Sequence, residues 1–145
     1  MYSNTADWLK IKDTTKPSTP IQLADMGYDV WLGSTRGRKE SNTHAVLNAA
    51  VDAAYWEYNF ADIGKEDFPA MIDTIIANRN LGTNCNKVTL VTHSSGANSS
   101  LVMAATNPAM ADKVGRIVNM APCLSINFNQ FWMDQRDISS VNMLY

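Results

Sequence analysis

The amino-acid sequence predicts an α/β fold in which parallel strands alternate with helices that cross over the sheet. Three short apolar runs, at residues 29–33, 88–92 and 117–121, have the length and composition of buried strands. Helical patterns lie between these runs, and strands that alternate with helices favour parallel pairing with right-handed crossovers. A chain of 145 residues that is 46% hydrophobic can bury one core. We therefore expect residues 1–145 to form a single α/β core.

The first part of the chain is predicted to contain one helix, one strand and a long excursion. Residues 18–26 have apolar side chains near helical spacing, and Pro20 is compatible with a first helical turn. Gly27 then marks a turn before the first apolar run. The segment 34–66 is too long for a plain loop. We therefore expect a helical stretch around residues 45–55, within an excursion at the carboxyl edge of the sheet.

Residues 68–78 carry the clearest helical signal. Asp67 can cap the first turn, and Pro69 fits within it. Gly82 is expected to end the helix. Apolar residues recur at i, i+3, i+4, i+7 and i+8, at Phe68, Met71, Ile72, Ile75 and Ile76. This spacing predicts an amphipathic helix that packs on one face of the sheet.

The second part of the chain alternates strand and helix more regularly. A buried strand is predicted at 88–91, followed by a helix of small residues at 95–106. Asn107 begins a second short helix that continues to residue 114, and the last strand follows at 117–121. The sequence between the two strands is therefore a helical crossover.

Composition and charge exclude several classes of function. Twelve basic and fourteen acidic residues give a net charge of -2, which leaves no electrostatic footprint for nucleic acid or an anionic membrane. No apolar run approaches the roughly 18 to 20 residues of a membrane span. The first residues are polar and lack the pattern of a signal peptide. We expect no nucleic-acid partner and no transmembrane segment in this sequence.

The two cysteines do not predict a disulfide. Cys85 precedes one predicted strand and Cys123 follows its parallel neighbour. The two would lie at opposite ends of the sheet, roughly 20 Å apart at about 3.3 Å per residue. This separation is beyond the reach of a disulfide, so the cysteines do not identify a redox compartment.

A candidate nucleophile, Ser94, lies where a predicted strand meets a predicted helix. Residues 92–96 read Thr-His-Ser-Ser-Gly, which differs from the Gly-x-Ser-x-Gly pattern of a nucleophile elbow only at Thr92. In such an elbow the backbone N–H of Ser95 would provide one oxyanion donor at the start of the helix. The alternative is an ordinary turn between a strand and a helix. The apolar residues before Ser94 and the small residues after it suit either interpretation.

The histidines do not complete a catalytic triad in the usual order. In α/β-hydrolases the serine precedes the acid and the histidine along the chain, but His44 and His93 both precede Ser94. His93 projects away from its neighbour on a tight turn, so we expect a packed histidine beneath the site. His44 is expected to be a surface or structural residue. Two late carboxylates could be triad acids, although a polar final segment explains them equally: Asp134 and Asp137.

Four stretches of the chain resemble the acid lipase family of α/β-hydrolases, which includes lysosomal acid lipase and gastric lipase. The most specific is LADMGYDVWLGSTRG at residues 23–37. The others are YWEYNF at 55–60, KEDFPAMID at 65–73, and VTHSSG at 91–96, which Thr-Asn-Pro and Met-Ala-Pro follow downstream. The resemblance extends over nearly the whole chain, from about residue 3 to residue 122.

The resemblance implies a partial α/β-hydrolase fold and a lipase-like chemistry. It matches Ser94 to the nucleophilic serine and Ser95 to the residue whose N–H helps form the oxyanion hole, with no metal or cofactor. It places Arg36 and His44 at family-like positions without a catalytic role. The expected substrates are esters of neutral lipids, namely triacylglycerols or sterol esters, with possible contact at a lipid interface. Secretion or a lysosomal location is expected if a signal peptide lies upstream of Met1.

Several departures from the family pattern favour a second hypothesis. The family has glycine in place of Thr92 and usually glutamine in place of Ser95. Its His-Gly oxyanion loop would lie just before Met1, residues 123–145 resemble the start of its cap or lid, and its Asp and His would lie later. We therefore expect this chain to correspond to the middle of a hydrolase and to be inactive by itself. The alternative is a non-catalytic lipase-like paralogue that at most binds lipid.

Overall fold

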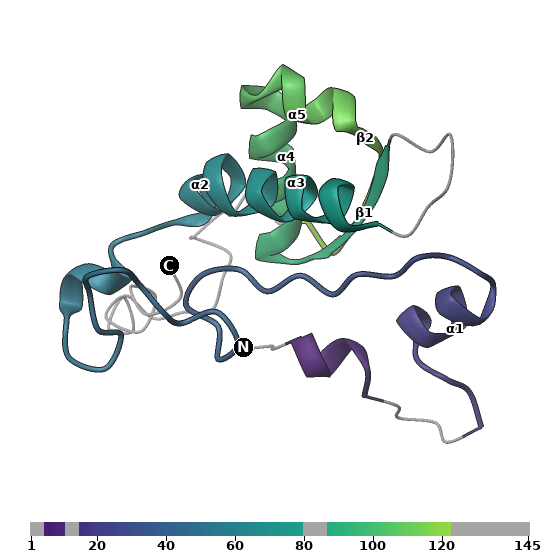
Figure 1. Cartoon of the computed structure of the whole chain (residues 1–145), viewed down its shortest axis with the longest axis horizontal. Coiled ribbons are helices and arrows are strands. Elements are labelled where there is room, and N and C mark those ends of the chain that lie inside the picture. Colours follow the sequence, from purple (N-terminus) through teal and green to yellow (C-terminus); the bar gives the residue numbers. More distant parts are fainter. Residues whose placement is uncertain (1–4, 11–14, 80–86, 123–145) are drawn as a thin grey trace, which may run out of the picture.

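The computed structural model of the chain describes residues 5–10, 15–79 and 87–122. Most of its regular structure lies after residue 59, and a long irregular segment comes before it (Figure 1). The elements, in order, are η1 (Thr5–Trp8), α1 (Thr19–Asp25), η2 (Ala53–Trp56), α2 (Phe60–Asp62), η3 (Ile63–Asp67), α3 (Phe68–Asn78), β1 (Val88–His93), α4 (Ser95–Thr106), α5 (Pro108–Lys113) and β2 (Val114–Met120).

The two strands form a parallel sheet, as predicted. Strand β1 pairs with β2 in a register that places Leu90 beside Ile117 and Thr92 beside Asn119. Helices α4 and α5 connect the strands, and this crossover is what allows them to run in the same direction. The predictions for α4 and β1 are confirmed. The second short helix and the last strand are confirmed as α5 and β2, but α5 ends at Lys113 and β2 runs from Val114 to Met120, so Val114 belongs to the strand and Ala121 does not. The architecture is that of a partial α/β fold.

The hydrophobic core lies between the helices and one face of this sheet. Ile72 of α3 and Met103 of α4 are completely buried and belong to one hydrophobic cluster. The other buried members are Phe68, Met110 and Val114, with Val88, Leu90 and Ile117 packed against them from the strands. No described element packs over the opposite face of the sheet, where the side chains of Val91, Val118 and Met120 are exposed. One face therefore provides nearly all of the packing that holds β1 and α4 together.

Residues 60–78 form one helical run with a π-helical turn inside it. Asn59 caps the start through its side chain, which accepts from the backbone N–H of Ala61. The π turn, η3, brings Gly64 against α4, where a Cβ would lie 2.4 Å from the carbonyl oxygen of Ser99. The prediction of a helix at 68–78 is confirmed, but it ends at Asn78, and Gly82 lies outside the described residues.

The prediction that Asp67 caps this helix is wrong. Asp67 has helical dihedral angles inside the continuous run and makes no side-chain capping bond. Its carboxylate instead accepts hydrogen bonds from Arg36, which is far away in sequence. The helix had already begun at Phe60, and there Asn59 provides the cap.

Of two further predictions for the first half, one is wrong and one is confirmed. Residues 29–33 are not a strand, since the segment makes no ladder bonds and Trp31 and Leu32 are exposed. Their composition favours an extended backbone, but a strand exists only when a neighbour pairs with it. The predicted helix at 18–26 is confirmed as α1, which lies apart from helices α2 to α5 in Figure 1.

The helix expected at 45–55 is reduced to the short turn η2. Side chains in this segment bond to the local backbone and compete with helical hydrogen bonds. The Nδ1 atom of His44 accepts from the N–H groups of Val46 and Leu47. Asp52 accepts from Asn48 N–H, and Asn48 in turn accepts from Ala50 N–H. These bonds fold the segment into successive turns.

Candidate active site at the end of strand β1

Ser94 is the single residue between β1 and α4, and its backbone is strained. Its dihedral angles are φ 54° and ψ −121°, outside the regions that residues with a side chain normally occupy. The predicted position of Ser94, between strand and helix with sparsely allowed dihedral angles, is confirmed. A strained residue of this kind is a reason to look for function at the turn.

A second strained residue lies at the same edge of the sheet. Ser94 and Ala121 are the two residues other than glycine with positive φ in the described part of the chain. Ala121 follows β2 directly, and the backbone N–H of Ser94 donates to the carbonyl oxygen of Met120 at 3.0 Å. The carboxyl ends of both strands are therefore joined at the Ser94 turn.

Helix α4 begins immediately after Ser94 and presents free backbone donors. The carbonyl oxygen of Ser94 accepts from the N–H of Ala97 at 2.9 Å and from that of Asn98 at 3.4 Å. The N–H of Ser95 lies in the first turn, where no earlier helical carbonyl can accept from it. Ser95 is exposed and Ser94 is half-buried. An oxyanion that formed at Ser94 would find this donor and the positive end of the helix beside it.

Thr92 fits beneath the turn without forcing the helix away. It is 7% exposed, and a Cβ on Gly96 would be 3.9 Å from the Thr92 Cβ, which is ordinary contact. The space at Gly96 therefore does not itself require glycine. The helix stands far enough from the strand to accommodate a branched side chain at position 92.

A buried polar network that the sequence analysis missed lies below Ser94. The hydroxyl of Thr92 donates to Oδ1 of Asn119 at 2.6 Å, and the hydroxyl of Ser100 lies 3.1 Å from the same oxygen. Ser100 is fully buried. Asn119 lies between the apolar residues Val118 and Met120, and this polar residue was the signal in the sequence that could have pointed to the network.

Neither histidine is placed as a general base. No hydrogen bond joins Ser94 to a histidine within the part of the chain that the structure describes. His93 is exposed, so the prediction of a packed histidine beneath the site is wrong. His93 ends β1, and its side chain lies on the same exposed face of the sheet as Val91. His44 is at the surface, as predicted, where its Nδ1 accepts from two backbone N–H groups. Cys85, Cys123, Asp134 and Asp137 lie outside the described residues.

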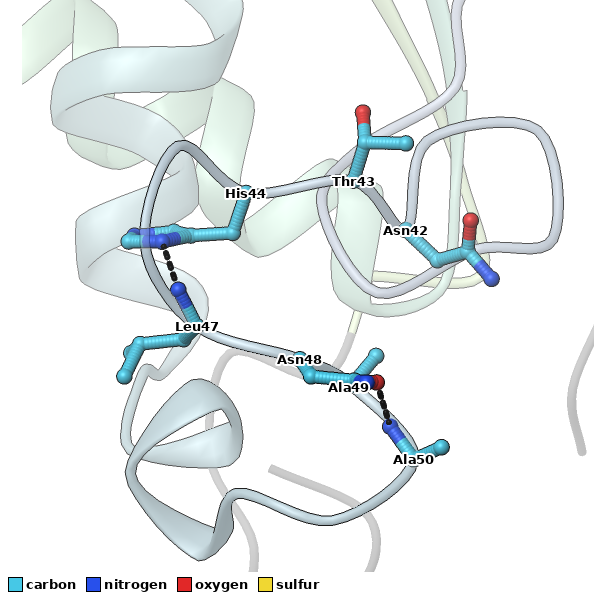
Figure 2. A pocket seen from close by; sticks show the side chains of 7 residues that line it. All are labelled: Asn42, Thr43, His44, Leu47, Asn48, Ala49 and Ala50. Carbon is cyan, nitrogen blue, oxygen red and sulfur yellow. Dashed lines mark hydrogen bonds between the residues drawn. The ribbon is translucent and has the colours of Figure 1, made fainter.

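A shallow hollow of about 450 Å³ lies elsewhere, in the loop that contains His44 (Figure 2). One continuous loop lines it, from Asn42 to Ala50, and Ser94 is not among the lining residues. The hollow therefore does not serve the Ser94 turn. Among the described residues no group of three His, Cys, Asp or Glu side chains is placed to hold a metal ion, and no helix is long and apolar enough to cross a membrane.

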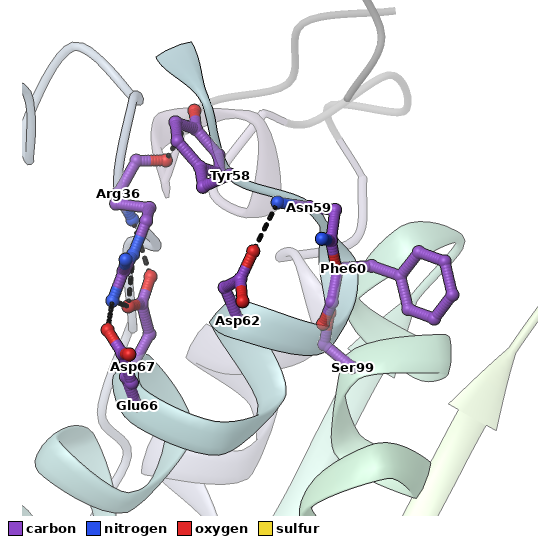
Figure 3. A network of polar contacts seen from close by, with 8 residues as sticks. All are labelled: Arg36, Tyr58, Asn59, Phe60, Asp62, Glu66, Asp67 and Ser99. Atoms are coloured by element: carbon purple, nitrogen blue, oxygen red, sulfur yellow. Dashed lines mark hydrogen bonds and ion pairs between the residues drawn. The ribbon is translucent and has the colours of Figure 1, made fainter. Parts of the chain in front are cut away.

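Arg36 attaches the irregular first half to the η3 turn (Figure 3). Its backbone N–H and Nε donate to the two oxygens of Asp67 at 2.8 and 2.7 Å, and Nη2 donates to Glu66 at 2.5 Å. The hydrogen bond to Asp67, more than any other contact, raises the pKa of Arg36 above its usual value. Tyr58 donates to the Arg36 carbonyl at 3.3 Å, and burial raises the pKa of Tyr58. These contacts anchor the segment around Arg36 to Glu66 and Asp67.

The parallel sheet, the strained serine at its carboxyl edge and the helix that starts at that serine define a segment of an α/β-hydrolase. No family model matches the chain. It is nevertheless related in sequence to the acid lipases, as the resemblance predicted. It is 32% identical to gastric triacylglycerol lipase of Mus musculus over 130 residues, which are 90% of this chain and 31% of that protein.

Two other relatives support this relationship. Lysosomal acid lipase/cholesteryl ester hydrolase of Rattus norvegicus is 32% identical over 126 residues, 87% of this chain and 30% of that protein. Lipase 1 of Drosophila melanogaster is 37% identical over 102 residues, 70% of this chain and 22% of that protein. The chain thus spans about a third or less of the length of the curated relatives it matches.

Proposed function

We propose that the chain carries the nucleophile of a lipase-like serine hydrolase, with Ser94 as the attacking residue. The observation that supports this most strongly is the strained backbone of Ser94 at the junction of β1 and α4. The cost of that strain has to be offset by the surrounding structure, and such residues cluster at functional sites. Residues 123–145, outside the described part of the chain, remain the expected start of a cap.

The chemistry follows from the positions of the donors. A general base takes the proton of the Ser94 hydroxyl while its oxygen attacks the ester carbonyl. The carbonyl oxygen becomes an oxyanion, which the backbone N–H of Ser95 stabilises at the start of α4. The alcohol then leaves with a proton, and water releases the acyl group from Ser94. The described residues do not place a base for the proton transfer, since neither His44 nor His93 hydrogen-bonds to Ser94.

We propose esters of neutral lipids as substrates. Two of the relatives are named for triacylglycerol and cholesteryl ester substrates. An uncharged ester also agrees with the site, because no arginine or lysine hydrogen bond is directed at the Ser94 turn among the described contacts. A charged head group would need such a partner.

Ester hydrolysis with an added base tests this proposal. The purified chain and its Ser94→Ala variant are assayed with p-nitrophenyl butyrate, with and without imidazole as the base. Without imidazole we expect little or no turnover, since an unassisted serine hydroxyl is a weak nucleophile. With imidazole we expect hydrolysis above the rate of imidazole alone, and Ser94→Ala should abolish that increment. An increment that survives in Ser94→Ala would contradict the assignment.

The second candidate function is lipid binding without catalysis. The absence of a histidine that contacts Ser94 favours it, together with Thr92 at a position where the acid lipase family has glycine. This hypothesis predicts no Ser94-dependent hydrolysis at any imidazole concentration, but binding of a fluorescent triacylglycerol analogue that is equal in the parent chain and in Ser94→Ala. The same two proteins therefore distinguish the two functions.

A further inference from the structure

The end of strand β2 holds the Ser94 turn through one side chain, that of Asn119. We propose that Asn119 is a positioning residue: it fixes the β1–α4 turn and thereby sets the direction of the Ser94 hydroxyl. The inference rests on the proposed function of Ser94 as the nucleophile. It assigns to Asn119 no contact with the substrate.

The first contact links Asn119 to the strand that leads into the turn. Thr92 and Asn119 are direct neighbours in the parallel register, and the Thr92 hydroxyl donates to Asn119 Oδ1 at 2.6 Å. Thr92 lies two residues before Ser94 and is buried. This short bond therefore fixes the end of β1 against β2 immediately before the backbone turns.

The second contact links the same oxygen to the helix that leaves the turn. The Ser100 hydroxyl, one and a half turns into α4, is 3.1 Å from Asn119 Oδ1 and 2.8 Å from the carbonyl oxygen of Ala97. A hydroxyl has one proton to donate, so Ser100 shares it between these two acceptors. Asn119 thus bridges the element before Ser94 and the element after it.

The backbone next to Asn119 makes the third contact. The carbonyl oxygen of Met120 accepts from the N–H of Ser94 at 3.0 Å. A change in the position of Asn119 would move this carbonyl as well, because the two residues are adjacent. The Asn119 side chain therefore contacts the elements before and after Ser94, and the backbone of Met120 next to it contacts Ser94 itself.

Burial of Thr92 makes the network sensitive to the loss of Asn119. The Thr92 side chain is buried, and its hydroxyl needs an acceptor there. Asn119 supplies it. Loss of Asn119 should consequently be worse than loss of the Thr92 hydroxyl: without Asn119 a buried donor has no acceptor, whereas without that hydroxyl Asn119 still has Ser100.

Four variants separate positioning from simple stabilisation. Asn119→Leu removes the acceptor of the Thr92 hydroxyl. Thr92→Val/Asn119→Leu replaces both partners by apolar groups of similar shape, so that no buried hydroxyl at position 92 is left without an acceptor. Thr92→Ser keeps the hydroxyl. Asn42→Leu makes the same chemical change at an exposed site and serves as the control. For each variant we would measure the urea midpoint, the ¹³Cα and ¹³Cβ chemical shifts of Ser94, which report its backbone dihedral angles, and kcat and KM for p-nitrophenyl butyrate with imidazole.

We expect Asn119→Leu to lower the urea midpoint and the double variant to recover it. The Ser94 shifts should nevertheless stay displaced in the double variant, and kcat should fall by up to about a hundredfold with KM unchanged, since small misplacements of a reacting group have effects of that size. Thr92→Ser and Asn42→Leu should match the parent chain. Parental Ser94 shifts and kcat in the double variant would overturn the proposal. If the parent chain itself shows no Ser94-dependent hydrolysis, the proposed function fails, and the Ser94 shifts alone still decide whether Asn119 positions the turn.

Discussion

The two halves of the described molecule are held together by different forces. Residues 60–78 and 87–122 supply six of the seven buried hydrophobic side chains: Phe68, Ile72, Ala97, Met103, Met110 and Val114. Residues 15–58 supply one, Tyr55, besides the buried ring of Pro20, and expose large apolar side chains such as Val46 and Met26. The first region is thus fixed by packing, and the second by local polar bonds and by an attachment at Arg36. The strained serine lies in the packed region, which can offset the cost of its conformation.

The largest test of this comparison is a cavity in the packed region. Ile72→Ala removes a completely buried side chain from the core, and we expect it to lower the free energy of unfolding by about 2 to 5 kcal/mol. Val46→Ala removes a side chain that is 86% exposed and should change stability by less than about 0.5 kcal/mol. Urea unfolding measures both. Similar losses for the two variants would mean that the irregular half is packed as firmly as the other.

A smaller effect is expected where the π turn contacts α4. A Cβ at position 64 would lie 2.4 Å from the Ser99 carbonyl oxygen and 2.9 Å from the Val102 Cβ. Gly64→Ala should therefore push the two helices apart and reduce stability by about 1 to 3 kcal/mol. Gly96→Ala is the matched control, because the nearest described atom outside α4 to its new Cβ is the Thr92 Cβ at 3.9 Å. If Gly96→Ala proves the more damaging of the two, α4 lies closer to β1 than the structure places it.

Loss of the ion pair between Arg36 and Asp67 should lower the global stability modestly and should clearly loosen the segment around Arg36. Asp67→Asn weakens the ion pair between Asp67 and Arg36. The Asp67 side chain is 11% exposed, and we expect the substitution to reduce the free energy of unfolding by about 1 kcal/mol. Trypsin should then cleave the native chain faster after Arg38 and Lys39. Asp73→Asn breaks a more exposed pair, with Lys113, and serves as the control. Unchanged cleavage in Asp67→Asn would show that Arg36 is not the main attachment.

The smallest expected effect is a pH dependence that arises from Tyr58. Burial raises its pKa above the ordinary value of 10.0, so the folded state holds this proton more tightly than the unfolded state does. The stability from this difference is complete below pH 10 and is lost as the pH rises through the pKa of the folded state. Tyr58→Phe should reduce the slope of stability against pH above pH 10, measured by urea unfolding. Tyr28→Phe, at an exposed tyrosine, is the control variant.

The same division between the halves determined which parts of the fold were predictable. Helices α3 and α4 were predicted with their observed bounds, because periodic apolar residues and small residues after a strand are local signals. The segment 29–33 has the composition of a strand but no partner, and pairing is not encoded locally. At 45–55, side chains such as Asn48 and His44 bond to nearby backbone groups and prevent the expected helix.

The candidate site was predictable in its centre but not in its support. The position and backbone strain of Ser94 could be predicted because Ser94 follows the apolar run 88–91 and precedes Gly96. The bond between Thr92 and Asn119 joins residues 27 positions apart and depends on the strand register, which the sequence does not reveal. Asp67 was assigned to a cap because its partner Arg36 is 31 positions away. Interactions across such separations became visible only in the folded structure.

Covalent trapping of Ser94 tests the central claim most directly. The native chain is treated with an aryl fluorophosphonate in imidazole buffer, and mass spectrometry locates the adduct. The account predicts an adduct on Ser94 and not on the more exposed Ser95, lost in Ser94→Ala and in the urea-unfolded chain. Absence of an adduct on Ser94, or equal labelling of Ser94 and Ser95 in folded and unfolded protein, would contradict the claim that the β1–α4 turn prepares a nucleophile.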